Sequence, residues 1–164
     1  MLKTIFATLS LVFGLAIFIP YYLGIWKKET KPHLLTWLIW FLLTALGFYL
    51  SYTFGGGAGS FTFALQSFLC LTIVVYALAK REKNIVRSDW IVFVFVLLTL
   101  FFYVITKNAM LSAFFAASID CMGYIPTFRK SYRQPFQEPV LTYSFSFISW
   151  FCSIFALANY SFAT

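Results

Sequence analysis

The chain alternates long apolar runs with short polar stretches that carry most of its charge. A helix that crosses a bilayer core needs roughly 20 apolar residues, or a few fewer when it is short, and six runs meet this condition. A glycine-rich turn at residues 53–59 joins the second and third runs, and a short break at 106–109 separates the fourth from the fifth. The pattern predicts an all-α polytopic membrane protein with six transmembrane helices, over residues 4–26, 34–52, 60–79, 90–105, 110–128 and 140–160.

The composition supports a membrane location. Of the 164 residues, 62% are hydrophobic and 10% are charged, and the mean hydropathy is +0.86, whereas about a quarter of the residues in a soluble domain are charged. We therefore expect residues 1–164 to form one membrane domain in contact with the lipid bilayer. The first apolar run follows Lys3 without a small-residue cleavage site, so we expect it to be a retained helix.

The distribution of basic residues predicts an orientation. The formal charge of +7 is confined to short loops, so we expect no nucleic-acid partner. Ten of the twelve Lys and Arg residues fall on one side of the predicted topology, and the positive-inside rule makes that side cytoplasmic. Both termini are then outside, and the short loops favour a prokaryotic plasma membrane. The ten are Lys27, Lys28, Lys31, Lys80, Arg81, Lys83, Arg87, Arg129, Lys130 and Arg133. We interpret His33, in the first of these loops, as a solvated residue.

Two stretches of the chain, residues 19–37 and 125–143, align without a gap at an offset of 106 residues. Pro20 then pairs with Pro126, and Thr36 pairs with Thr142. Both prolines lie near the predicted cytoplasmic ends of helices that run in the same direction, so the duplication is parallel. Internal repeats of this kind are typical of transporters.

This arrangement resembles the PQ-loop superfamily, which includes the SWEET and SemiSWEET sugar transporters and the lysosomal amino-acid exporters. The resemblance implies a first three-helix unit at residues 1–80, a linker helix at 88–107 and a second unit at 108–164. Pro20 and Pro126 match the motif prolines, but Tyr21 and Thr127 stand where the family has glutamine. The seventh helix of the family is also missing, so a homo-oligomer is one way to complete the second unit.

The two prolines are candidate hinges. A proline lacks the amide hydrogen and clashes with the preceding turn, so each should kink or end its helix and free the carbonyl four residues earlier. Their matched positions favour a hinge at a cytoplasmic gate. The alternative is a helix end at the membrane interface, where proline costs little. The candidate hinge and gate residues are Pro20, Pro126, Tyr21 and Thr127.

Asp120 is the one charged residue in the middle of a predicted span. An acid there costs about 2.5–3.5 kcal/mol on insertion scales, so we interpret it as a proton-coupling carboxylate or a ligand anchor, or alternatively as a protonated packing residue. The second and sixth spans present small hydroxyl-bearing faces with a tryptophan, which suit a solute pocket or close helix packing. The third helix of the resembling transporters contributes a polar pocket residue, which implies Gln66. The candidate substrate-binding residues are Asp120, Trp40, Trp150, Gln66, Ser146, Ser149 and Thr44.

The sequence contains no HExxH, GxSxG or paired intramembrane carboxylates, and its metal-ligating residues do not cluster. We therefore expect neither an enzyme nor a cofactor or metal site. The three cysteines, Cys70, Cys121 and Cys152, have no CxxC spacing, and we interpret them as buried packing residues.

Two functions remain. The first is a small-solute transporter, for a sugar, an amino acid or a similar molecule, that works by alternating access, with protons as a hypothetical coupling ion. The second is a non-transporting membrane receptor or accessory protein, because KDEL receptors share this layout. A wet polar cavity at the depth of Asp120 would favour the first.

Overall fold

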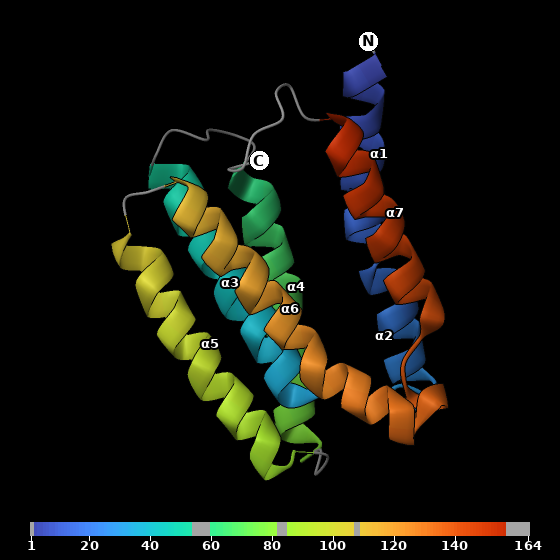
Figure 1. Ribbon diagram of the computed structural model, residues 1–164. Coiled ribbons are helices and arrows are strands. Elements are labelled where there is room, and N and C mark those ends of the chain that lie inside the picture. Colours follow the sequence, from blue (N-terminus) through green and yellow to red (C-terminus); the bar gives the residue numbers. More distant parts are fainter. Residues whose placement is uncertain (1, 54–59, 82–84, 107–108, 157–164) are drawn as a thin grey trace. The chain divides into compact units, whose positions relative to one another are not determined.

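The computed structural model describes residues 2–53, 60–81, 85–106 and 109–156 (Figure 1). Regular structure in these ranges is helical, which confirms the predicted all-α class. The helices are α1 (Leu2–Ala16), α2 (Phe18–Trp26), α3 (Leu34–Thr53), α4 (Ser60–Ala79), α5 (Arg87–Ile105), α6 (Ala109–Arg133) and α7 (Val140–Ala156), with a 3-10 turn, η2, at Pro135–Gln137.

In the part of the chain that the structure describes, three helical stretches are long and apolar enough to cross a membrane: Leu2–Trp26, Thr62–Ala79 and Arg87–Ile105. Leu34–Tyr49 and Val140–Ala156 are shorter apolar helices. The glycine-rich turn at 54–59, the break at 107–108 and the end of the last predicted helix at 157–160 lie outside the described residues. Six transmembrane spans therefore remain a prediction.

The first predicted helix is interrupted at Ile17, as the proline rule predicts. α1 ends at Ala16 and α2 begins at Phe18, so Pro20 lies in the first turn of α2. The amide of Ile17 still donates to the Phe13 carbonyl at 3.1 Å. Proline is tolerated in the first turn of a helix because the amide groups there have no intrahelical acceptor.

Pro126 does not end its helix. We expected the fifth helix to stop near residue 128 and its basic residues to lie in a loop, but α6 continues to Arg133. Figure 1 shows the ribbon of α6 changing direction over its C-terminal part. Lys130 and Arg133 lie in the last turn, where positive charge interacts favourably with the helix dipole. This interaction is one reason why the helix extends past the proline.

The chain divides into two compact units, which we describe separately. Unit 1 consists of residues 1–31 and 135–162 and holds α1, α2 and α7; unit 2 consists of residues 32–134 and holds α3 to α6. Each unit therefore combines helices from both halves of the predicted repeat.

In unit 1, α1 and α7 run antiparallel along each other (Figure 1). Ser149 Oγ donates to the Ser10 carbonyl at 2.8 Å, and Thr142 Oγ1 donates to the Ile17 carbonyl at 3.3 Å. The second bond reaches the residue at which the first helix is interrupted. Aromatic rings also pair along this contact, Phe6 with Phe155 at 5.3 Å and Phe13 with Phe145 at 5.6 Å.

In unit 2, α3, α5 and α6 share an apolar core. Ile39, Val96 and Ile119 contribute one fully buried side chain from each helix. α4 packs along α3, where a Cβ atom at Gly47 would lie 3.2 Å from the ring of Phe63. Small residues allow such close helix contacts, which stabilise helix association in lipid.

The two halves of the predicted repeat form comparable antiparallel pairs. In unit 1, Thr142 of α7 contacts the carbonyl of Ile17. The equivalent residues in unit 2, at the offset of 106, are Thr36 and Gly123. Thr36 instead accepts a hydrogen bond from Thr127 at 3.0 Å, one helical turn beyond Gly123. The pairing of a first helix with the second helix of the other half thus occurs twice, shifted by one turn.

Candidate functional site

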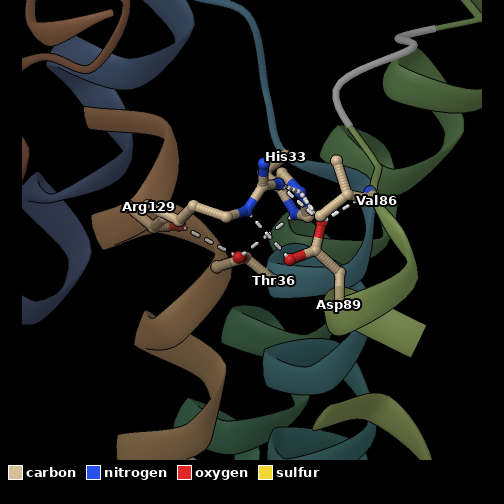
Figure 2. A network of polar contacts seen from close by, with 6 residues as sticks. His33, Thr36, Val86, Asp89 and Arg129 are labelled. Carbon is tan, nitrogen blue, oxygen red and sulfur yellow. Dashed lines mark hydrogen bonds and ion pairs between the residues drawn. The ribbon is translucent and has the colours of Figure 1, made fainter. Parts of the chain in front are cut away.

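Polar side chains of unit 2 meet where α3 and α5 begin and α6 approaches its end: His33, Thr36, Asp89 and Arg129 (Figure 2), together with Thr127, which bonds to Thr36. We call them the polar cluster. His33 precedes α3, Thr36 lies in its first turn, Asp89 lies in the first turn of α5, and Thr127 and Arg129 follow Pro126 in α6. His33, Thr36, Asp89 and Thr127 are buried. The cluster therefore joins three helices at one end of the unit.

Asp89 is the centre of this cluster. Arg129 donates to its carboxylate from Nε at 3.1 Å and from Nη2 at 2.6 Å, and the amide of Val86 donates to Oδ2 at 2.9 Å. The position of Asp89 in the first turn of α5 places its charge at the positive end of the helix dipole. A carboxylate that is 1% exposed requires such compensation, because an unpaired buried charge is very costly.

His33 connects Asp89 to the hydroxyls of the cluster. Its Nε2 lies 3.3 Å from Asp89 Oδ2, and its Nδ1 lies 3.5 Å from Thr36 Oγ1. One tautomer of His33 satisfies both ring nitrogens: Nε2 carries the proton and donates to Asp89, while Nδ1 accepts from the Thr36 hydroxyl. Thr127 then donates to Thr36 at 3.0 Å. The result is a chain of hydrogen bonds that all point from α6 through α3 toward Asp89.

The surroundings of His33 favour its neutral form. Burial is the largest cause and lowers the pKa of His33 from its ordinary value of 6.5; Asp89 opposes this shift, and Arg129 and Lys130 add to it. Arg129 Nη2 lies only 3.4 Å from His33 Nε2. A second proton on this imidazole would therefore place two cations side by side.

The polar cluster corrects two interpretations of the sequence. His33 is 1% exposed and is not a solvated loop residue, because α5 and α6 supply it with polar partners. Arg129, which we interpreted as an orientation determinant, binds a buried acid. The sequence pattern alone does not single out Asp89 as a site residue. An acid just before the apolar run of α5 is a recognisable sign of a helix start, but its distant partners are set by the tertiary fold.

Asp120 lies near the middle of α6 and is half-buried. Its side chain lies close enough to Trp40 to interact with the indole, yet Trp40 Nε1 is buried without a well-formed hydrogen bond to any described residue. The rings of Trp40 and Tyr124 are 5.0 Å apart and meet edge to face. Asp120 thus faces an aromatic surface whose indole N–H lies nearby but makes no well-formed hydrogen bond.

The other candidate substrate-binding residues are divided between the units. In unit 2, Thr44 Oγ1 donates to the Trp40 carbonyl at 2.7 Å, and Gln66 is half-buried on α4. In unit 1, Ser149 donates to α1, Ser146 is half-buried, and Trp150 is 62% exposed. The hydroxyls of Thr44 and Ser149 are therefore used within helices or between them, as the packing alternative expects.

The candidate hinge residues of the first repeat, Pro20 and Tyr21, both lie in unit 1. Pro20 lines a cavity of about 310 Å³ in unit 1, together with Lys27, Thr30 and Leu141. This cavity adjoins the end of α2. Tyr21 is fully buried.

One prediction about burial was wrong. Cys121 is exposed, whereas Cys70 and Cys152 are buried as expected; Cys121 lies on the outer face of α6. Glu138 is also buried, and it accepts a hydrogen bond from Tyr143 at 2.9 Å.

Within the described ranges, no group of three or more His, Cys, Asp or Glu side chains could hold a metal ion. Comparison of the chain with protein-family models, with characterised proteins and with solved structures gave no match.

Proposed function

We propose that this chain is an integral membrane protein with six spanning helices, formed by two parallel repeats, that moves a small polar solute by alternating access. The observation that supports this most directly is the order of residues along α6. This helix carries the half-buried acid Asp120, then the buried Pro126, and then Arg129, which binds a buried acid of another helix. One helix thus combines a candidate binding group, a bend and a releasable contact.

The chemistry around Asp120 suggests the kind of solute. A carboxyl group at mid-membrane is costly unless a partner or a cavity compensates for it. Trp40 Nε1 needs an acceptor, and the Asp120 carboxyl group can accept further hydrogen bonds. A solute that both donates and accepts, such as a sugar or an amino acid, would satisfy both groups.

The polar cluster would serve as the gate at the basic end of the protein. His33, Asp89 and Arg129 follow or precede loops that the positive-inside rule assigns to the cytoplasm. A buried ion pair is stable when intact and very unfavourable with one partner missing, so it favours two discrete arrangements over a continuous range. Because Pro126 removes one backbone hydrogen bond from α6, the segment that carries Arg129 is the part of this helix that can move at least cost.

One observation is also compatible with a non-transporting membrane receptor, the alternative function. A Cβ atom at Gly123 would lie 3.0 Å from Trp40 Nε1 and 3.2 Å from Ile39 Cγ2, so α3 and α6 are tightly packed close to Asp120. A closed midplane of this kind is expected of a receptor, and also of a transporter in a state without solute.

A ligand screen on the detergent-purified protein tests the proposal. Sugars, neutral and cationic amino acids and vitamins would be added at about pH 5.5 and about pH 7.5, on either side of the ordinary histidine pKa. A true ligand raises the melting temperature by mass action, and the isosteric Asp120→Asn variant should weaken the effect. Cys121→Ser, a change at the adjacent exposed position, is the matched control. A folded protein that no compound stabilises would favour the receptor.

A further inference from the structure

His33 lies between the two members of a buried ion pair. Its Nε2 is 3.3 Å from the carboxylate of Asp89 and 3.4 Å from the guanidinium of Arg129. Neutral His33 donates to the same carboxylate that Arg129 binds through two donors, so the charges of Asp89 and Arg129 balance without a charge on the imidazole. The arrangement is thus complete only while His33 is neutral.

We propose that His33 is a proton-binding site, and that uptake of one proton there releases Arg129 from Asp89 and separates the ends of α3 and α6. A role of the Arg129–Asp89 contact as a gate for solute rests on the proposed function. The proton site itself rests on the geometry of the cluster.

The charges around His33 show why one proton would be enough. The charged groups that act on His33 are Asp89 of α5, and Arg129 and Lys130 of α6. Neutral His33 leaves Asp89 and Arg129 balanced. Protonated His33 competes with Arg129 for the carboxylate of Asp89, and it adds a buried positive charge beside Arg129 and Lys130.

Protonation of His33 also weakens the hydrogen bonds that hold α3 against α6. The added proton binds at Nδ1, which in the neutral form accepts from the Thr36 hydroxyl. Thr36 must then turn and accept from His33, while Thr127 already donates to the same oxygen. The Thr36 hydroxyl hydrogen loses its acceptor in a buried position, which costs free energy. Both effects favour separation of Thr36 from Thr127, the contact between α3 and α6.

Cysteine labelling of the full chain in detergent measures this separation without any solute. In a variant with the three native cysteines replaced by alanine, Thr127→Cys places a thiol at a position that is 3% exposed. Arg133→Cys, two turns further along α6 and exposed, provides the reference. The ratio of the two maleimide labelling rates cancels the pH dependence of the thiol chemistry. In the open form, in which Arg129 has left Asp89, His33 takes up a proton near the ordinary histidine pKa of 6.5. The labelling rate at position 127 divided by the rate at position 133 should therefore rise up to about tenfold between about pH 7.5 and about pH 5.5.

Three variants make the test decisive. His33→Gln retains hydrogen-bonding groups but cannot be charged, so its ratio should stay low at both pH values; His33→Asn repeats the test if the Gln variant does not fold. Asp89→Asn removes the anion, so its ratio should already be high at about pH 7.5. A ratio that does not change in the protein with His33, or a rise that persists in His33→Gln, would overturn the proposal.

This readout is independent of transport. If the ratio responds to pH while the ligand screen stays blank, the proton site is supported and the transporter assignment is not. If a solute binds through Asp120 while the ratio stays flat, the transporter assignment is supported and His33 is only a structural residue.

Discussion

Arg129 donates to both carboxylate oxygens of Asp89, at 3.1 and 2.6 Å, so a bidentate ion pair joins the end of α6 to the first turn of α5. Bidentate arginine–carboxylate pairs are among the strongest and most directional polar contacts in proteins. Asp89 is 1% exposed and Arg129 is 21% exposed, so solvent screens only one side of the pair. This contact holds the start of α5 against the end of α6, and several predictions depend on it.

Removal of the Asp89 charge should destabilise the protein strongly. Asp89→Asn leaves Arg129 without its anion, and loss of one partner of a buried pair typically costs about 3–5 kcal/mol; the partial exposure of Arg129 argues for the lower end. Chemical or thermal unfolding in detergent, followed by circular dichroism, would measure the loss. Arg87→Gln, an exposed charge change in the same turn, should have little effect. Equal losses in the two variants would contradict the buried pair.

Stability should depend on pH through His33. The pKa of His33 is lowered from 6.5 in the folded chain, so the unfolded chain takes up this proton first as the pH falls. Above about pH 6.5 the residue is neutral in both states and costs nothing. Below it the free energy of unfolding should decrease by at most about 1.4 kcal/mol per pH unit, until the pH reaches the folded-state pKa.

Denaturant titrations between about pH 7.5 and about pH 5, a window above most carboxylate pKa values, would measure this slope. His33→Gln should remove it. If the slope is the same in both proteins, another group is responsible, and the surroundings assigned to His33 are wrong.

Gly123 should tolerate no larger side chain. A Cβ atom there would lie 3.0 Å from Trp40 Nε1 and 3.2 Å from Ile39 Cγ2, so Gly123→Leu forces α3 and α6 apart. Overpacking of this kind costs about 1–3 kcal/mol. Cys121→Leu, on the exposed face of the same helix, is the matched control and should melt near the wild-type temperature. A fully stable Gly123→Leu protein would show that α3 and α6 are not in contact there.

Ser149 distinguishes packing from solute binding. Its hydroxyl donates to the Ser10 carbonyl at 2.8 Å, so Ser149→Ala should destabilise unit 1 by about 0.6 kcal/mol, the average for such contacts between membrane helices. Ser144→Ala, which removes an exposed hydroxyl that bonds only within α7, should cost less. If Ser149→Ala instead abolishes ligand binding without loss of stability, the hydroxyl belongs to a solute pocket.

The helices were largely predictable, because their apolar runs are long and their breaks carry local signals. The runs at 34–52, 60–79 and 90–105 match α3, α4 and α5 within a few residues, and the interruption at Ile17 follows from Pro20. Pro126 was harder to interpret, since the same residue type remains inside a continuous helix. A proline shows where a backbone hydrogen bond is lost, but tertiary contacts decide whether the helix stops.

The polar cluster could not be predicted from local patterns. His33, Asp89 and Arg129 are separated by 56 and 40 residues, and each has an ordinary explanation when considered alone: a loop histidine, a helix-start acid and an orientation charge. Only the packing of α3, α5 and α6 brings them within hydrogen-bonding distance. Burial of a charge is a property of the fold, and hydropathy along the chain does not report it.

The most direct test of alternating access is the accessibility of position 120 from both sides of the membrane. In a variant without native cysteines, Asp120→Cys would be treated with a membrane-impermeant thiol reagent in right-side-out and inside-out vesicles, beside Phe114→Cys on the exposed face of α6. A transporter predicts that position 120 reacts from both sides, in each case faster than position 114. If position 120 reacts from neither side while the protein remains folded, the midplane is closed and the transporter assignment is wrong.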